Sequence, residues 1–320
     1  MELPKNSHHS DLFKRYHKNP FLAPSDWPYK CNSIFNAAAT IYNNKVLILC
    51  RVEDMKGASH LCKAVSDDGF TNWQIDKEPT MIAEPDKYPE EAYGIEDPRI
   101  VLLDDPDEPD GTFAVTYTSF STNGPLVSLA TTKDFVSFKR YGVVMPPDDK
   151  DASLFPRRFN GKWMLIHRPT PTSWSLGAHI WVSMSPDLKH WGDSQVLIPA
   201  RKGSWWDAYK VGLGPQPVLT KDGWLIIYHG VRTTAAGSIY RLGLAMLDLD
   251  DPTKIIKRCD EWVFGPQEIY ERIGDVPDVT FPCGVVVKDD QLIMYYGAAD
   301  TSMAIATASM SDVLEYIKNA

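Results

Sequence analysis

The sequence has no long hydrophobic run and no excess of positive charge. No stretch reaches the roughly 18 consecutive apolar residues that a membrane-spanning helix needs, and residues 1–5 contain no apolar core of a secretory signal. With 33 Lys and Arg against 42 Asp and Glu, the net charge is −9. This charge disfavours nucleic acid, because phosphate backbones are bound by basic surfaces. We therefore expect a cytoplasmic protein that has neither a membrane nor a nucleic acid as its partner.

Cysteine is scarce and lacks the spacing of a metal site. The five cysteines form no C-x-x-C pair and no zinc-ligand pattern with histidine. Several interrupt apolar runs, as Cys50 does after residues 47–49, so we expect them to be reduced and buried. The glycine patterns of nucleotide-binding loops, the H-E-x-x-H motif and the G-x-S-x-G motif are absent too. We expect neither a metal nor a cofactor.

Short apolar runs rich in β-forming residues are abundant. Five of them each follow a turn signal of Asn, Asp or Gly, at residues 45–49, 113–117, 163–166, 224–228 and 292–296. A convincing helix pattern appears only at residues 311–317, which begin with a Ser-Asp capping pair. The sequence therefore predicts an all-β protein with a short C-terminal helix.

The strand signals recur as a repeat. The five turns follow one another at intervals of 50 to 67 residues. Three units also contain a Ser or Thr, an Asp turn and an aromatic residue, at 66–73, 132–138 and 185–191. Repeats of this length, with several strands each, are typical of β-propeller blades. We predict a single domain over residues 1–320 that forms a five-bladed β-propeller, and a β-sandwich with long loops is the alternative.

The segment 94–99, Gly-Ile-Glu-Asp-Pro-Arg, places two carboxylates and a guanidinium before an apolar run. Neighbouring side chains of an extended strand point to opposite faces, so Glu96 and Asp97 are not expected to face one ligand together. Pro98 is expected to hold Asp97 in an extended backbone. That would aim one carboxylate in a defined direction, as an acid catalyst requires. The plain alternative is a charged turn before a strand.

Polar residues interrupt the strand ends at matching places in all five units. In a propeller they would point at one central cavity. There, carboxylates and amides can form hydrogen bonds with sugar hydroxyls, and cations can bind an oxyanion. From the first unit to the fifth, these residues are Asn36 and Arg51; Asp97 and Arg99; Lys150, Asp151 and Arg168; Asp207, Lys210 and His229; Asp278 and Asp300.

Several motifs together resemble glycoside hydrolase family 130, which comprises β-mannoside phosphorylases and some β-mannosidases on a five-bladed propeller. The resemblance covers about residues 20 to 310 and rests on the order and spacing of the motifs. They are Gly-Ile-Glu-Asp-Pro-Arg at 94–99, Leu-Phe-Pro at 154–156, His-Arg-Pro at 167–169, Lys-Val-Gly at 210–212, Tyr-His-Gly-Val at 228–231, Phe-Pro-Cys-Gly at 281–284 and Tyr-Gly-Ala-Ala-Asp-Thr at 296–301.

The resemblance implies a role for individual residues. Asp97 matches the family's general acid, whose proton is thought to pass through a hydroxyl of the bound mannose. Arg168, Lys210 and His229 match phosphate-binding positions, while Asn36, Arg51, Tyr240 and Asp300 match positions near the mannosyl ring. Many phosphorylases of the family carry Arg-Asn where this chain has Lys150-Asp151. Lys150 can still meet an anion as a point charge, and Asp151 brings a negative charge nearby.

Chemistry favours phosphorolysis over hydrolysis. An inverting hydrolase needs a second carboxylate as base, and three cationic or cationisable groups, Arg168, Lys210 and His229, would weaken such a base. We expect inverting phosphorolysis of β-mannosides by inorganic phosphate, with short β-1,2-mannosides as the favoured substrates and α-mannose 1-phosphate as the product. An inverting β-mannosidase and a non-catalytic carbohydrate-binding propeller are the alternatives. A homo-oligomer is possible.

Overall fold

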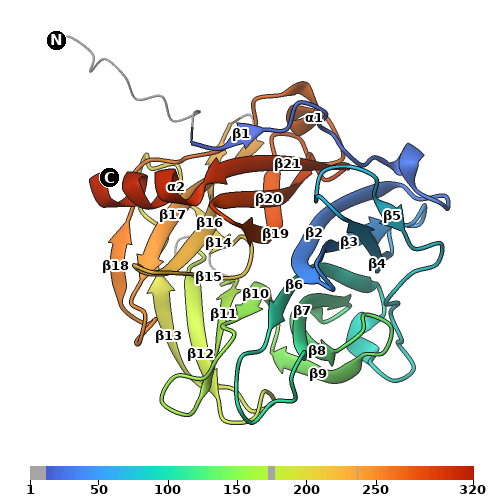
Figure 1. Ribbon diagram of the computed structural model, residues 1–320, viewed down its shortest axis with the longest axis horizontal. Helices are drawn as coiled ribbons and strands as arrows, with labels where there is room; N and C mark the ends of the chain where they lie inside the picture. Colours follow the sequence, from blue (N-terminus) through green and yellow to red (C-terminus); the bar gives the residue numbers. More distant parts are fainter. Residues whose placement is uncertain (1–11, 172–176, 236) are drawn as a thin grey trace.

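The computed structural model describes residues 12–171, 177–235 and 237–320. The described chain is mostly β-strand, organised as antiparallel meanders of consecutive strands that surround a common centre (Figure 1). The first two meanders are β2–β5 and β6–β9, joined into one sheet by a single parallel bridge between Ser59 and Gly94. Their strands are β2 Ser33–Tyr42, β3 Lys45–Glu53, β4 Ser59–Ser66, β5 Gln74–Ile75, β6 Gly94–Leu102, β7 Phe113–Ser121, β8 Gly124–Thr132 and β9 Lys139–Met145.

Three further sheets complete the architecture. The last one combines both ends of the described chain, because β1 pairs with β21. The strands of these sheets are β10 Asp149–Leu154, β11 Trp163–Pro169, β12 Ile180–Ser185 and β13 Gly192–Ile198; β14 Lys210–Leu213, β15 Val218–Thr220, β16 Gly223–Thr234, β17 Gly237–Leu247 and β18 Ile255–Arg258; and β19 Thr280–Lys288, β20 Gln291–Ala298, β21 Ser302–Ser309 with β1 Lys14–Arg15.

Helices are few and short. Two 3₁₀ turns span Pro24–Asp26 and Pro89–Glu91, and α1 spans Ile269–Arg272. The predicted C-terminal helix is present as α2, Met310–Asn319, but its N-cap is Ser309, whose hydroxyl accepts a hydrogen bond from the Asp312 N–H. No helix among the described residues is long and apolar enough to cross a membrane.

Four of the five predicted apolar runs form the second strand of a meander, and the run at 224–228 forms β16, which pairs with both β14 and β15. Along β3, the side chains alternate between two cores: Leu47 and Leu49 pack against the second meander, whereas Val46 and Ile48 pack against the last sheet. Both faces of such a strand are buried, which explains why its sequence is continuously apolar rather than alternating. The five cysteines are buried and free, as predicted.

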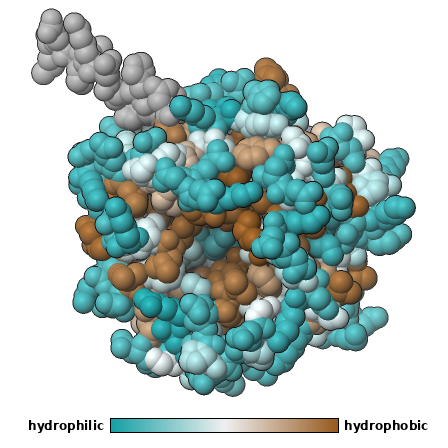
Figure 2. Space-filling model, viewed as in Figure 1, coloured by the Kyte–Doolittle hydropathy of each residue, from teal (hydrophilic) through white to brown (hydrophobic). Residues whose placement is uncertain are grey.

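Buried clusters join each meander to the next. One cluster lies between the first and second meanders, and others between the second and third, third and fourth, fourth and fifth, and fifth and first. The series therefore closes on itself, and the middle of the molecule is hollowed (Figure 2). This arrangement brings one end of every meander to a common centre.

The repeated Asp turn has one structure in every copy. Oδ1 of Asp68, Asp134 and Asp187 accepts hydrogen bonds from the backbone N–H groups two and three residues later. Asp248, at the end of β17, makes the same pair of bonds and is a fourth copy that the sequence comparison missed. Its unit lacks the preceding Ser or Thr by which the other three were recognised.

Candidate active site

A cavity of about 130 Å³ lies where the first strands of the meanders begin. Ten of the thirteen residues that the sequence singled out for the site line it, and they come from all five meanders. These ten are Asn36, Arg51, Asp97, Lys150, Asp151, Arg168, Lys210, His229, Tyr240 and Asp300, and the apolar residues Val276, Val279 and Phe281 complete the wall.

A β-bulge that recurs in three strands directs three of these side chains into the cavity. The pairing of β2, β6 and β10 with the next strand shifts register around Asn36, Asp97 and Asp151, respectively. Each of the three has a positive φ, of 50°, 47° and 55°. Asn and Asp tolerate this left-handed conformation better than other residues with a Cβ, and a bulge redirects a side chain out of the ladder. The expectation that Pro98 keeps Asp97 extended was therefore wrong, because Asp97 is the bulge residue.

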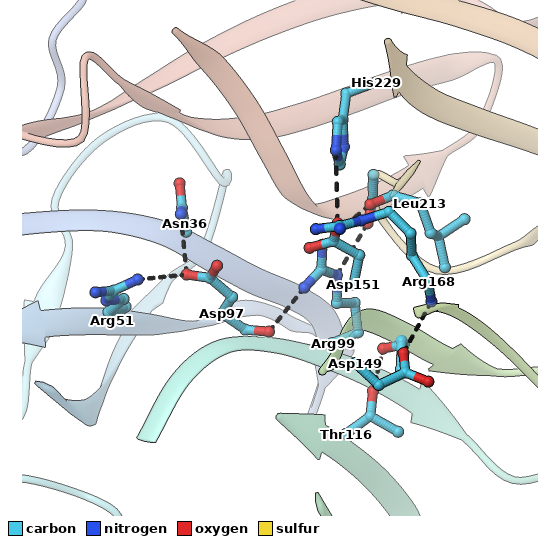
Figure 3. A network of polar contacts seen from close by, with 12 residues as sticks. Asn36, Arg51, Asp97, Arg99, Thr116, Asp149, Asp151, Arg168, Leu213 and His229 are labelled. Atoms are coloured by element: carbon cyan, nitrogen blue, oxygen red, sulfur yellow. Dashed lines mark hydrogen bonds and ion pairs between the residues drawn. The ribbon is translucent and has the colours of Figure 1, made fainter. Parts of the chain in front are cut away.

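Asp97 lies at one side of the cavity, 6% exposed, and is held by two donors (Figure 3). Its Oδ1 accepts hydrogen bonds from Asn36 Nδ2 at 2.9 Å and Arg51 Nη1 at 3.2 Å. The same guanidinium reaches Glu96 Oε1 at 3.2 Å, but Glu96 does not line the cavity. Burial acts to raise the pKa of Asp97, yet the charges of Arg51 and Lys150 outweigh it and lower the pKa.

Asp300 is a second carboxyl group on the same side. Burial and the charge of Asp97 raise its pKa to about 7, although Arg51 opposes this shift. The two carboxyl groups therefore lose their protons at different pH values. Near neutral pH, Asp97 is ionised, while Asp300 is protonated in a substantial fraction of the molecules. The sequence had suggested a single acid, and the structure places two carboxyl groups of unequal acidity beside one another.

Three further cations line the cavity near Asp151, on what we call its cationic side, although the Lys150 charge also acts on Asp97. Lys150, Arg168 and Lys210 line it together, and burial together with the Arg168 charge lowers the pKa of Lys210 to about 8. His229, in contrast, is not a cation at neutral pH, because burial lowers its pKa to about 3. Its two ring nitrogens have no hydrogen-bond partner among the described residues. The expected trio of cationic groups is therefore formed by two lysines and one arginine, with a neutral imidazole beside them.

Asp151 lies among these groups and is 1% exposed. Its Oδ2 accepts a hydrogen bond from Arg168 Nε at 2.8 Å and lies 3.5 Å from His229 Nε2 (Figure 3). Burial acts to raise the pKa of Asp151, but the neighbouring charges, first that of Arg168, hold it well below its usual range. The close approach requires Gly212 opposite His229, because a Cβ there would lie 2.4 Å from Asp151 Oδ2.

Three predicted site residues lie outside the cavity wall. Arg99 is buried beneath it and donates to the carbonyl oxygens of Asp97, Leu213 and Gly214. Asp207 is fully buried, and its Oδ2 accepts hydrogen bonds from three donors, Arg201 Nη1, Tyr228 Oη and Arg258 Nη2. Asp278 accepts a hydrogen bond from the Tyr240 N–H through its carbonyl oxygen. The positions of Arg99 and Asp207 indicate that they support the architecture and do not contact a ligand.

Two residues that sequence reasoning missed hold the cationic side in place. Thr170 Oγ1 accepts a 2.7 Å hydrogen bond from Arg168 Nη1. Asp149 Oδ2 pairs with His167 Nδ1 at 2.6 Å, and its Oδ1 accepts from the Arg168 N–H. Asp149 directly precedes Lys150, and Thr170 directly follows the His-Arg-Pro motif at 167–169, so proximity to these noticed residues was the available signal. Their polar types alone are typical of any strand end.

The geometry defines a class: an all-β protein whose central cavity is lined by the carboxyl groups of Asp97, Asp151 and Asp300 together with the cations Arg51, Lys150, Arg168 and Lys210. The family model described as β-1,4-mannooligosaccharide phosphorylase matches residues 4–319, and the chain belongs to this family, glycoside hydrolase family 130.

Relatives and solved structures agree with this assignment. The chain is 37% identical over 311 residues to a 1,2-β-oligomannan phosphorylase of Thermoanaerobacter sp. (strain X514), covering 94% of this chain and 98% of that protein. The structure of the β-1,2-mannobiose phosphorylase from Listeria innocua, in complex with β-1,2-mannobiose, matches with a TM-score of 0.85 and 30% identity over 96% of this chain and 99% of its own. Another solved structure matches with a TM-score of 0.79 and 25% identity over 96% of this chain and 95% of its own. Its description states that this family of mannoside phosphorylases contains glycoside hydrolases that target β-1,2 mannosidic linkages in Candida mannan.

The raised pKa of Asp300 leads to an expected effect on stability. Its folded pKa of about 7 lies above the unfolded value of about 3.9, so its contribution to the free energy of unfolding is present at low pH and is lost as the pH rises from about 4 to about 7. At about 1.4 kcal/mol per pKa unit, the loss is a few kcal/mol at most. We expect Asp300→Asn to raise the melting temperature at pH 8 more than at pH 5. Equal shifts at both pH values, measured by calorimetry, would contradict the raised pKa.

Proposed function

We propose that the five meanders are the blades of a five-bladed β-propeller and that the protein is an inverting β-mannoside phosphorylase. The closure of the last sheet by β1 and the five shared cores support the propeller. The single observation that carries the function is the lining of the cavity, which combines Asp97, held by Asn36 and Arg51, with the cations Lys150, Arg168 and Lys210.

Inorganic phosphate occupies the cationic side. Arg168 offers a planar fork, Lys150 and Lys210 offer point charges, and neutral His229 offers a ring N–H. Phosphate carries its own negative oxygen, so it needs no base in order to attack the anomeric carbon. Attack from the face opposite the glycosidic oxygen inverts the configuration and gives α-mannose 1-phosphate.

Asp97 supplies the proton for the departing sugar. Burial acts to raise its pKa, but the neighbouring cations Arg51 and Lys150 outweigh burial and keep the pKa low. A bound phosphate dianion offsets those cations and raises the pKa of Asp97, which favours its acid form when both substrates are present. Asn36 and Arg51 hold the carboxyl group in one orientation, while Tyr240 and Asp300 are placed to contact the mannosyl ring.

The hydrolase alternative is favoured by one observation, the presence of glycoside hydrolases within the family. An inverting hydrolase needs its base on the face of the sugar opposite the acid. On the cationic side the available carboxylate is Asp151, which is bound to Arg168 and has a low pKa, and such a group is a poor base. Asp300 has a suitable pKa but lies in the electrostatic field of Asp97 and Arg51, on the side of the acid. Phosphorolysis is therefore the better supported reaction.

Short β-1,2-mannooligosaccharides, with β-1,2-mannobiose first, are the proposed substrates. The names of the oligomannan and mannobiose phosphorylases support this linkage, while the description of the family model points to β-1,4-mannosides. Both linkages therefore belong in the assay.

Phosphate dependence tests the function directly. The protein is incubated with β-1,2-mannobiose or β-1,4-mannobiose, with and without phosphate, and the products are identified by NMR spectroscopy. We expect α-mannose 1-phosphate to form only when phosphate is present. Release of free mannose at the same rate in phosphate-free buffer would establish a hydrolase instead.

Asp97→Asn tests the acid. The amide cannot give up a proton, so turnover is expected to fall by about 10²–10⁴-fold, the usual contribution of general acid catalysis. Affinity for mannobiose, measured by calorimetry, is expected to stay within a few fold. Glu96→Gln is the matched control, because Glu96 also contacts Arg51 but lies outside the cavity wall. If Glu96→Gln lost as much turnover as Asp97→Asn, the role assigned to Asp97 would be wrong.

Lys210 should make phosphate use pH-dependent. Its pKa of about 8 means that the side chain loses its positive charge as the pH rises through about 8, so kcat/KM for phosphate should fall across that range. Lys210→Arg is expected to remove this inflection because arginine stays charged. Lys210→Ala should raise the KM for phosphate far more than the KM for the mannoside. Equal changes in the two KM values would indicate that Lys210 supports the fold.

A further inference from the structure

Asp151 presents a buried oxygen that the protein itself does not satisfy. Its Oδ2 accepts the Arg168 hydrogen bond, but Oδ1 has no hydrogen-bond donor within the described part of the chain. Arg99 Nη2 lies 3.8 Å from Oδ1, which is beyond hydrogen-bonding distance. A buried carboxylate oxygen without a donor is costly, and such atoms usually have a ligand or water as their partner.

The surroundings of this oxygen select the kind of partner. Asp151 lines the same cavity as Lys150, Arg168 and Lys210, which together attract an anion. An ionised carboxylate has only acceptors, so a neighbouring ligand oxygen must carry a proton, and a bare anionic oxygen would be repelled. His229, whose neutral ring is 3.5 Å from Oδ2, can donate or accept through either free nitrogen and does not impose a charge.

We propose that the carboxylate of Asp151 accepts a hydrogen bond from the P–OH group of monohydrogen phosphate and thereby excludes sulfate from the anion site. This inference rests on the proposed phosphorolysis. Monohydrogen phosphate and sulfate have nearly the same size and the same charge near neutral pH, but only phosphate has an O–H group to donate. Sulfate would bring its bare oxygens against Asp151 with no compensating hydrogen bond. The residue thus acts through an unfavourable contact with the wrong anion, a common source of specificity.

The proposal explains why a carboxylate is tolerated inside a cation cluster. A negative charge there weakens the attraction for every anion, so it would be a disadvantage if charge alone determined affinity. It becomes useful when the ligand has both negative oxygens and one hydroxyl. The cations then bind the negative oxygens, and Asp151 binds the hydroxyl.

The test measures the binding of phosphate, arsenate and sulfate to the mannoside-free protein by calorimetry near pH 7. Sites that hydrogen-bond a ligand O–H reject analogues that lack it by large factors, so we expect the wild-type protein to bind phosphate at least about 100-fold more tightly than sulfate. Arsenate, which also carries an O–H group, should behave like phosphate and replace it in the reaction. Comparable affinity of the wild-type protein for sulfate and phosphate would overturn the proposal without any variant.

Asp151→Asn is the informative variant, because the amide keeps the shape and an oxygen for Arg168 Nε while gaining donors for sulfate. We expect sulfate affinity to rise at least 10-fold and phosphate affinity to fall, so that selectivity is largely lost. Thr170→Val is the matched control: it removes the other partner of Arg168 and should weaken both anions by a similar factor, leaving their ratio unchanged. Melting temperatures confirm that each variant is folded.

The outcomes also separate this inference from the proposed function. If Asp151→Asn raised the KM for mannobiose and left anion selectivity unchanged, the free oxygen would serve a sugar hydroxyl and the inference would be wrong. A protein that hydrolyses mannobiose without phosphate but still prefers phosphate over sulfate through Asp151 would disprove the phosphorylase and retain the inference. If neither phosphate nor sulfate bound to the protein, the phosphorylase function and the inference on Asp151 would both be disproved.

Discussion

The buried guanidinium of Arg99 is the contact on which the geometry of the cavity depends. It is 1% exposed and donates three hydrogen bonds to carbonyl oxygens, one in β6 and two at the end of β14. Its charge also faces Asp151 of β10 at 3.8 Å. A buried arginine is costly unless its donors are satisfied, and here they are satisfied by backbone atoms of separate meanders. One side chain beneath the cavity therefore sets the distance between the acid side and the cationic side.

Above this contact, a single backbone device is used three times. The bulges at Asn36, Asp97 and Asp151 turn three side chains inward from three neighbouring strands. Left-handed conformations cost energy for residues with a Cβ and persist where the surrounding structure enforces them, often at functional sites. In the fourth meander the corresponding strand has no such bulge, and Gly212 leaves room there for His229 and Asp151 to approach each other. The repeat thus supplies the same polar position several times, and the residue type at each copy determines its chemistry.

The sequence was sufficient to predict five central strands, one in each meander, because two-sided burial produces continuous apolar runs that are easy to recognise. It also identified nine of the ten polar residues of the cavity, because a polar residue stands out at the end of such a run, whereas Tyr240 was identified only through the family resemblance. It could not distinguish a ligand contact from a buried structural pair: Asp207 and Asp151 look alike in sequence, yet the former is surrounded by Arg201 and Arg258 outside the cavity. Protonation was equally hidden, because the neutrality of His229 and the raised pKa of Asp300 arise from burial and neighbours that only the fold brings together.

The cavity draws its residues from almost the full length of the chain, from Asn36 to Asp300. Asn36 and Asp300, the first and last of these residues in the sequence, lie in the first meander and in the last sheet, which β1 completes by pairing with β21. Contacts between residues so distant in sequence are slow to form, because loop closure costs entropy before the contact can repay it. A chain that lacks the last sheet therefore has most of its strands but lacks Phe281 and Asp300 of the cavity wall, so the site is complete only when that sheet is in place.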